Sequence, residues 1–205
     1  MPDSQITVVA PFPVAELPRV WLWMQETPSL LDVNIGPKTM DEFVDDWMNR
    51  TALTFGVWRD GVLGGMVAYE PLDASTGALH CVFKKGATRA DSFLGRKNTI
   101  PVAMAVFADL FAIGVERITM TVFQSNHAIQ SLIKDIGGEL EAIFFHPCTT
   151  DGREIIHLYH GEPQPLLQYT VYASTFGKPN ERGRTYNDWI KSAVSKELAA
   201  RAAGG

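Results

Sequence analysis

Hydrophobic residues in the first fifty positions follow the spacing of one strand and two helices. Residues 6–10 (ITVVA) predict the strand, and the apolar spacing over residues 14–24 predicts the first helix. Residues 39–50 predict the second helix, with Thr39 and Glu42 at the spacing of a capping box. We expect the buried stripe of this second helix to consist of Met40, Phe43, Val44 and Trp47.

The hydrophobic period changes between residues 52 and 83 from that of helices to that of strands. Residues 52–71 predict a hairpin, because two β-rich runs meet at Arg59-Asp60-Gly61 and Asp-Gly is a strong turn signal. Residues 77–83 (GALHCVF) predict a third strand. The centre of the chain therefore predicts part of a sheet.

Helices and strands alternate in the second half of the chain. Residues 100–114 predict a helix that is apolar on almost every side, and residues 115–123 predict a strand with alternating apolar and polar side chains. Residues 125–138 predict a short helix that ends at Gly137-Gly138, and another strand follows at once. We expect residues 154–160 (EIIHLYH) to be the last clear strand.

The order of these elements predicts one α/β domain over residues 1–160. Residues 161–205 differ in character: a proline-containing linker and a polar, turn-rich stretch precede a predicted terminal helix. We interpret residues 161–205 as a C-terminal extension of the domain. We find no internal repeat.

Composition limits the classes of function. The 205 residues carry a net charge of -5, which gives no overall attraction to nucleic acid or to an anionic membrane. Two cysteines, Cys81 and Cys148, form neither a disulfide framework nor a zinc motif, and the histidines show no metal-ligand spacing. No signal peptide or membrane-spanning run is recognisable. We expect a cytoplasmic protein that binds no metal, nucleic acid or membrane.

A basic segment, residues 84–97, opposes the acidic average. It holds five cations and one acid, so its charge is about +4, and it directly precedes the apolar helix. Helix N-termini attract anions, Gly86 and Gly95 would let an anion approach the backbone, and Asn98 or Thr99 would cap the helix. The segment predicts a pyrophosphate cradle, and the alternative is a solvated surface loop. No Gly-x-Gly-x-x-Gly or P-loop motif occurs. The five cations are Lys84, Lys85, Arg89, Arg96 and Lys97.

A polar pair, Ser125-Asn126, stands where a strand gives way to a helix. Open α/β sheets bind ligands at the carboxyl ends of their strands, so this position is a candidate for ligand contact. The alternative is an ordinary helix cap, because Asn is a favoured N-cap residue. Spacing alone leaves both open.

Two segments together resemble the GNAT family, the GCN5-related N-acetyltransferases: HCVFKKGATRADSFLGRKNTIPVAMAVFADLF (80–111) and RITMTVFQSNHAIQSLIKDIGGELEAIFF (117–145). In that family a strand leads into a glycine- and arginine-containing loop and a long helix that bind the pyrophosphate of acetyl-CoA. A later strand ends in Asn before a helix that ends near Gly. The resemblance covers residues 50–160 and implies a mixed, mostly antiparallel central sheet flanked by helices, an α/β (α+β) fold. The chain also looks like small acetyltransferases encoded by tailed bacteriophages.

The resemblance implies acetyl-CoA as acyl donor and an amine as acceptor. The family commonly places its catalytic base on the strand before the loop, which implies His80, with Glu70 behind it. The alternative for His80 is a structural side chain. The resemblance also implies that backbone N–H groups from Cys81 to Phe83 polarise the thioester oxygen, while we expect the Cys81 side chain to be a small core residue. The implied cofactor-binding residues are Cys81, Val82, Phe83, Arg89, Gly95, Arg96, Lys97, Asn98, Thr99 and Asn126.

The chain also departs from the family. The loop carries Ser92 and Lys97 at its first and last motif positions, and Ile133 stands where many members have the Tyr that protonates the leaving thiolate. One hypothesis is an N-acetyltransferase acting on a protein N-terminus, a lysine or a small molecule. The second is an inactive GNAT scaffold that serves as a binding or structural module, in a phage particle or against a host protein, with the C-terminal extension docking a protein partner. A third is a nucleotide-binding protein that uses the basic segment.

Overall fold

The computed structural model describes residues 6–26, 37–84, 96–124, 126–144, 158–159, 162–163 and 165–177. None of the helices in these stretches is both long and apolar enough to cross a membrane. The helical elements are η1 (Val14–Glu16), α1 (Leu17–Glu26), α2 (Met40–Arg50), α3 (Arg96–Ala112) and α4 (His127–Asp135). The strands are β1 (Ile6–Val9), β2 (Leu53–Arg59), β3 (Val62–Pro71), β4 (Thr76–Phe83), β5 (Arg117–Phe123), β6 (Glu139–Phe144), β7 (Leu158–Tyr159), β8 (Glu162–Pro163) and β9 (Leu166–Tyr172).

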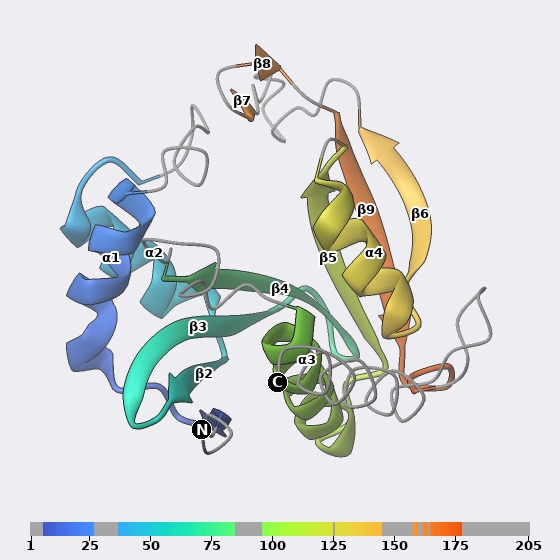
Figure 1. Ribbon diagram of the computed structural model, residues 1–205, viewed down its shortest axis with the longest axis horizontal. Helices are drawn as coiled ribbons and strands as arrows, with labels where there is room; N and C mark the ends of the chain where they lie inside the picture. The colour runs from blue at the N-terminus through green and yellow to red at the C-terminus, as the bar shows by residue number, and fades with distance from the viewer. Residues whose placement is uncertain are drawn as a thin grey trace, which may run out of the picture.

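Seven of the described strands form one twisted sheet in the order β1-β2-β3-β4-β5-β9-β6 (Figure 1). Neighbouring strands in this sheet are antiparallel, except that β4 and β5 run parallel. The mixed, mostly antiparallel sheet with flanking helices confirms the expected fold class.

Helices cover both faces of the sheet. Alternate residues of a strand point to opposite faces, so neighbouring Met66 and Val67 of β3 belong to different cores. Met66 packs with α1 and α2, whereas Val67 packs with α3. Ile136, just after α4, lies in the same core as α3, so α3 and α4 share one face. The face toward α1 and α2 carries the site described below.

Local signals place several elements as predicted. Asp60 (φ 52°) and Gly61 (φ 77°) both have positive φ, as the two-residue turn of the β2–β3 hairpin requires. Thr39 caps α2 by accepting a hydrogen bond from the Glu42 N–H at 3.2 Å. Within the expected stripe of α2, Phe43 is buried, but Met40, the first residue of the helix, is exposed.

The strands β4 and β5 part soon after they meet. They pair only over Thr76–Ala78 of β4 and residues 117–119 of β5. At this junction the Thr119 hydroxyl donates a hydrogen bond to the Gly77 carbonyl at 3.3 Å. Beyond it β5, with β9 and β6, turns away from β4 (Figure 1). The sheet therefore opens into a fork at its centre.

Two predicted boundaries are wrong. The helix α3 begins at Arg96, so Asn98 and Thr99 lie inside its first turn and do not cap it. Pro101 therefore lies inside the helix, where it has no N–H to donate to the carbonyl of residue 97.

The last strand of the sheet was also misplaced. β9 lies between β5 and β6, so the sheet domain runs at least to Tyr172 and does not end at residue 160. Of the expected strand 154–160, only the two-residue β7 is described. The predicted terminal helix lies outside the described residues.

Candidate active site

A cleft of about 340 Å³ opens where β4 and β5 separate. One wall of the cleft comes from α2 and includes Phe43, Trp47 and Arg50. The floor comes from β3 and β4, and a second wall comes from Thr121 and Phe123 of β5 with the start of β9. Because the strands do not pair here, both their side chains and their backbone edges face the cleft.

The backbone of β4 directs alternate amides into the fork. The Lys84 N–H donates to the Gly64 carbonyl of the β3 side at 2.9 Å, and hydrogen-bonding direction alternates along a strand. The Val82 amide therefore points toward β3, whereas the amides of Cys81 and Phe83 point toward β5. Among the described residues, no strand pairs with β4 on that side beyond Ala78. Of the three implied backbone donors, Val82 is thus turned away from the fork.

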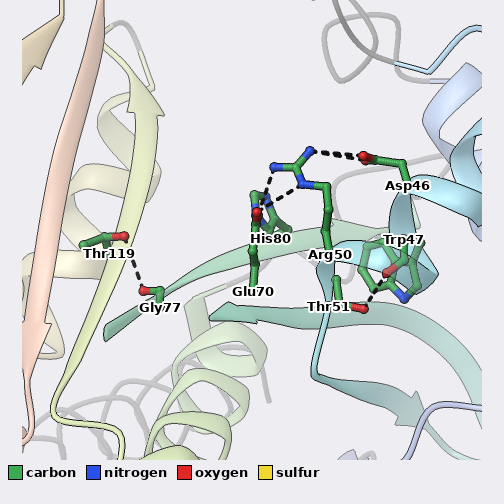
Figure 2. Close-up of polar contacts among 8 residues, drawn as sticks. All are labelled: Asp46, Trp47, Arg50, Thr51, Glu70, Gly77, His80 and Thr119. Atoms are coloured by element: carbon green, nitrogen blue, oxygen red, sulfur yellow. Dashed lines mark hydrogen bonds and ion pairs between the residues drawn. The ribbon is translucent and has the colours of Figure 1, made fainter. Parts of the chain in front are cut away.

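His80 and Glu70 meet on the floor of the cleft. In the β3–β4 register His80 lies opposite Ala68, so Glu70 is its diagonal neighbour on the same face. Glu70 Oε2 lies 2.7 Å from His80 Nε2 (Figure 2). The His80 side chain is 47% exposed and the Glu70 side chain 16% exposed, so the imidazole is more open to solvent than the carboxylate that it contacts. The two residues predicted as catalytic therefore form a hydrogen-bonded pair.

Arg50, the last residue of α2, contacts Glu70 from the wall that α2 forms (Figure 2). Its Nε and Nη2 donate to Glu70 Oε1 and Oε2 at 3.1 and 3.0 Å, and its Nη1 donates to Asp46 Oδ2 at 3.3 Å. Asp46 lies one helical turn earlier, which is the spacing for an intrahelical ion pair. The bidentate contact holds both oxygens of the carboxylate.

The network keeps Glu70 ionised. Burial alone would raise the pKa of Glu70, but the hydrogen bonds from Arg50 and His80 outweigh burial and lower the pKa below its ordinary value. The same contact with Glu70 raises the pKa of Arg50, although partial burial opposes it. Near neutral pH the site therefore holds a carboxylate between a permanent cation and an imidazole.

The exposure of Cys81 differs from our prediction. We predicted a small core residue, but Cys81 is exposed on the cleft wall, because no described layer covers this part of β4 once β5 has turned away. Neighbouring protein atoms nevertheless partly desolvate the thiol, and this desolvation raises the pKa of Cys81 to about 12. The sulfur is therefore a neutral thiol near neutral pH, which is a poor nucleophile.

The structure describes only some of the other implied cofactor residues. Arg89 and Gly95 lie outside the described residues, and so do the side chains of Arg96 and Lys97, whose backbone opens α3. Asn98 and Thr99 are buried in the first turn of α3 and offer little side-chain surface to a ligand. Asn126 caps α4: its side chain accepts a hydrogen bond from the Ile129 N–H at 3.3 Å. The cap alternative for Asn126 is thus confirmed, and a contact with a ligand stays a prediction.

Ile133 is buried in the core beneath α4. It packs with Val122 and Leu167 and is 2% exposed. Its side chain is aliphatic and packs in this core, so Ile133 supplies no proton donor to the cleft.

Sequence reasoning missed Arg50 and Asp46. Their spacing of four on a predicted helix could have suggested an ion pair. Nothing in the sequence indicated that Arg50 would meet Glu70, which is 20 positions away and on a strand.

Comparison with known proteins identifies the fold. No protein-family model matches the chain, and no curated protein matches its sequence. Solved structures do match. The ribosomal-protein-S18-alanine N-acetyltransferase from Escherichia coli superposes with a TM-score of 0.56 at 18% identity, over 82% of this chain and 94% of that one.

Two further structures agree with this result. A chimera of the spermidine N-acetyltransferase from Vibrio cholerae with hSSAT matches with a TM-score of 0.63 at 13% identity, over 84% of this chain and 98% of that one. A GNAT-family acetyltransferase from Bacillus anthracis matches with a TM-score of 0.57 at 16% identity, over 82% of this chain and 95% of that one. Together with the forked sheet, these likenesses show that the chain has the GNAT acetyltransferase fold.

Proposed function

We propose that this protein is an acetyl-CoA-dependent N-acetyltransferase that acetylates a primary amine. The observation that carries the proposal is the position of the His80–Glu70 pair at the fork: His80 lies on β4, next to Cys81, whose amide points into the same opening, and Glu70 lies on the neighbouring strand β3. A thioester in the fork would find an N–H donor for its carbonyl oxygen, and an amine in the cleft would find a base.

These groups can carry out each proton transfer and charge stabilisation that acetyl transfer requires. His80 takes a proton from the acceptor ammonium, and the neutral amine attacks the thioester carbonyl carbon. The Cys81 N–H donates to the carbonyl oxygen as negative charge develops on it. A C–N bond forms, the C–S bond breaks, and the acetylated amine loses its second proton to water.

The absence of a tyrosine at position 133 does not prevent this reaction. Thiols have a pKa of about 8.5, so CoA leaves as a reasonably stable thiolate without prior protonation. The basic segment 84–97 would hold the pyrophosphate, because it directly precedes the N-terminus of α3 and that helix itself begins with Arg96 and Lys97. These assignments follow from the fold likeness and the local charge.

Thermal denaturation with acetyl-CoA, CoA and ATP in parallel tests the proposal. A ligand at 100 times its Kd adds about 2.7 kcal/mol to the free energy of unfolding, which gives a clear rise in Tm. We expect a rise with acetyl-CoA and CoA but not with ATP. The double variant Arg96→Ala/Lys97→Ala should lose the rise, whereas Arg59→Ala, which removes a partly exposed arginine at the end of β2, should keep it. Release of CoA thiol over a panel of amines then measures transfer.

A second candidate is an inactive binding module on the same scaffold. The buried Ile133 in place of a proton donor favours it. On this hypothesis the protein docks a protein partner through residues after the sheet, as a structural component of a phage particle or against a host protein. No Tm rise with any of the three ligands, together with co-purification of a large partner, would support this candidate over the enzyme.

A further inference from the structure

Arg50, itself held by Asp46, restricts the protonation state of Glu70 (Figure 2). Arg50 donates to both carboxylate oxygens, and Asp46 holds the outer nitrogen of the same guanidinium. A guanidinium is always protonated and has no acceptor atom. Glu70 therefore meets Arg50 only as an ionised acceptor, and its lowered pKa agrees with this role.

The short contact with His80 then specifies the position of a proton. Glu70 Oε2 and His80 Nε2 are 2.7 Å apart, and an ionised carboxylate oxygen has no proton to donate. The proton in this hydrogen bond must therefore belong to Nε2. A neutral imidazole carries one proton, so Nδ1 is left with the free lone pair.

We infer that Arg50 is a positioning residue that, by holding Glu70 as a fixed acceptor, selects the Nε2–H tautomer of His80 and leaves Nδ1 as the atom that accepts the proton of the amine. The role of Nδ1 as proton acceptor rests on the proposed function. The Nε2–H tautomer does not, because it is a property of the protein without substrate. The described charged groups around the ring are Glu70 from β3 and Asp46 and Arg50 from α2, and the titratable neighbour on β4 is Cys81.

A purely structural role for Arg50 is the competing explanation. In that case the ion pairs only fasten the end of α2 to β3, and His80 is indifferent to them. Loss of stability on mutation cannot separate the two roles, because both predict it. The protonation state of each His80 ring nitrogen can separate the two roles, because it depends on residue 50 only if Arg50 positions Glu70.

The first test is ¹⁵N NMR of the histidine rings in the full chain without substrate. The chain has five histidines, so His80→Gln assigns the His80 signals by their loss. We expect neutral His80 to carry its proton on Nε2 in the wild type. In Arg50→Gln both tautomers should be populated, because the Glu70 carboxylate loses its bidentate partner and can turn away. Arg50→Lys keeps the positive charge but loses the bidentate guanidinium, so the populations of its two tautomers should lie between those of the wild type and Arg50→Gln.

A matched control comes from α1. Arg19 is 52% exposed, as Arg50 is, and pairs with Glu16 at 2.9 Å away from the cleft lining. Arg19→Gln should leave the His80 signals unchanged. Backbone ¹H–¹⁵N spectra would confirm that each variant is folded before its ring signals are compared. A wild-type His80 protonated on Nδ1, or a tautomer unchanged in Arg50→Gln, would overturn the inference.

Steady-state kinetics supply the second test. General bases contribute about 10²–10⁴-fold to a rate, so partial loss of the correct tautomer should lower kcat about tenfold or less in Arg50→Gln. The KM for acetyl-CoA should change little, because no contact with the donor is lost. If the tautomer shifts as expected but no amine is acetylated by the wild type, the proposed function fails while the assignment of the Nε2 proton stands. If acetylation occurs and kcat is unaffected in a variant whose tautomer has shifted, the role of Nδ1 is refuted.

Discussion

Gly77, at the junction of the fork, should tolerate no side chain. An alanine Cβ at this position would overlap the Cε2 and Cζ atoms of the Tyr69 ring and lie 2.7 Å from the Glu70 carbonyl oxygen. Ordinary contact begins near 3.4 Å, so this oxygen would have to move by about 0.7 Å, the difference between the two distances. Tyr69 is only 6% exposed, so its ring has little room to swing aside. Overpacking of this kind costs about 1–3 kcal/mol.

Urea denaturation and Tm would measure this cost. For a chain of this size about 1 kcal/mol lowers Tm by about 2–4 °C, so Gly77→Ala should lose roughly 2–12 °C. Gly56→Ala is the comparison variant: its Cβ would lie 2.8 Å from Trp58 Nε1 but would have no backbone atom among its three closest neighbours, so it should cost less than Gly77→Ala. In a double-mutant cycle, Tyr69→Leu should relieve part of the clash and give a coupling of about 0.5 kcal/mol or more. A Gly77→Ala protein within about 0.5 kcal/mol of the wild type, or strict additivity with Tyr69→Leu, would refute the packing argument.

Three further predictions concern single side chains of the site and its surroundings. Asn126→Ala should lower the free energy of unfolding by about 1 kcal/mol because α4 loses its N-cap, while Asn126→Asp should retain most of it; equal stability of both variants in urea would contradict the capping role. Glu70→Gln should destabilise the protein near neutral pH, because the folded-state pKa of Glu70 lies below the ordinary 4.5. This stabilisation is present above pH 4.5 and disappears as the pH falls through the lowered pKa, so denaturation curves of the two proteins should converge in acid; a gap that persists there would point to lost packing instead. Cys81 in a Cys148→Ser background should react slowly with iodoacetamide near neutral pH, and acetyl-CoA should slow the reaction further if it occupies the fork. Mass spectrometry of the alkylated protein measures this, and identical rates with and without acetyl-CoA would place the donor elsewhere.

The sequence by itself determined the local elements of this protein. The Asp60-Gly61 turn, the Thr39 cap of α2 and the alternation of β5 are each encoded by residues within a few positions of one another. Such signals depend on backbone preference and side-chain reach, which act before any tertiary contact forms. The resemblance to the GNAT family implied His80 with Glu70 behind it, and the structure places these two side chains in hydrogen-bonding contact.

Only the tertiary structure decided the rest. The insertion of β9 between β5 and β6 and the exposure of Cys81 at the fork depend on which strands pair and where they stop pairing. Arg50 belongs to the site because α2 packs across the face that carries Glu70, and its helical spacing gives no hint of that partner. Contacts between distant segments result from the packing of whole layers, so no local pattern around Arg50 or Cys81 contains them.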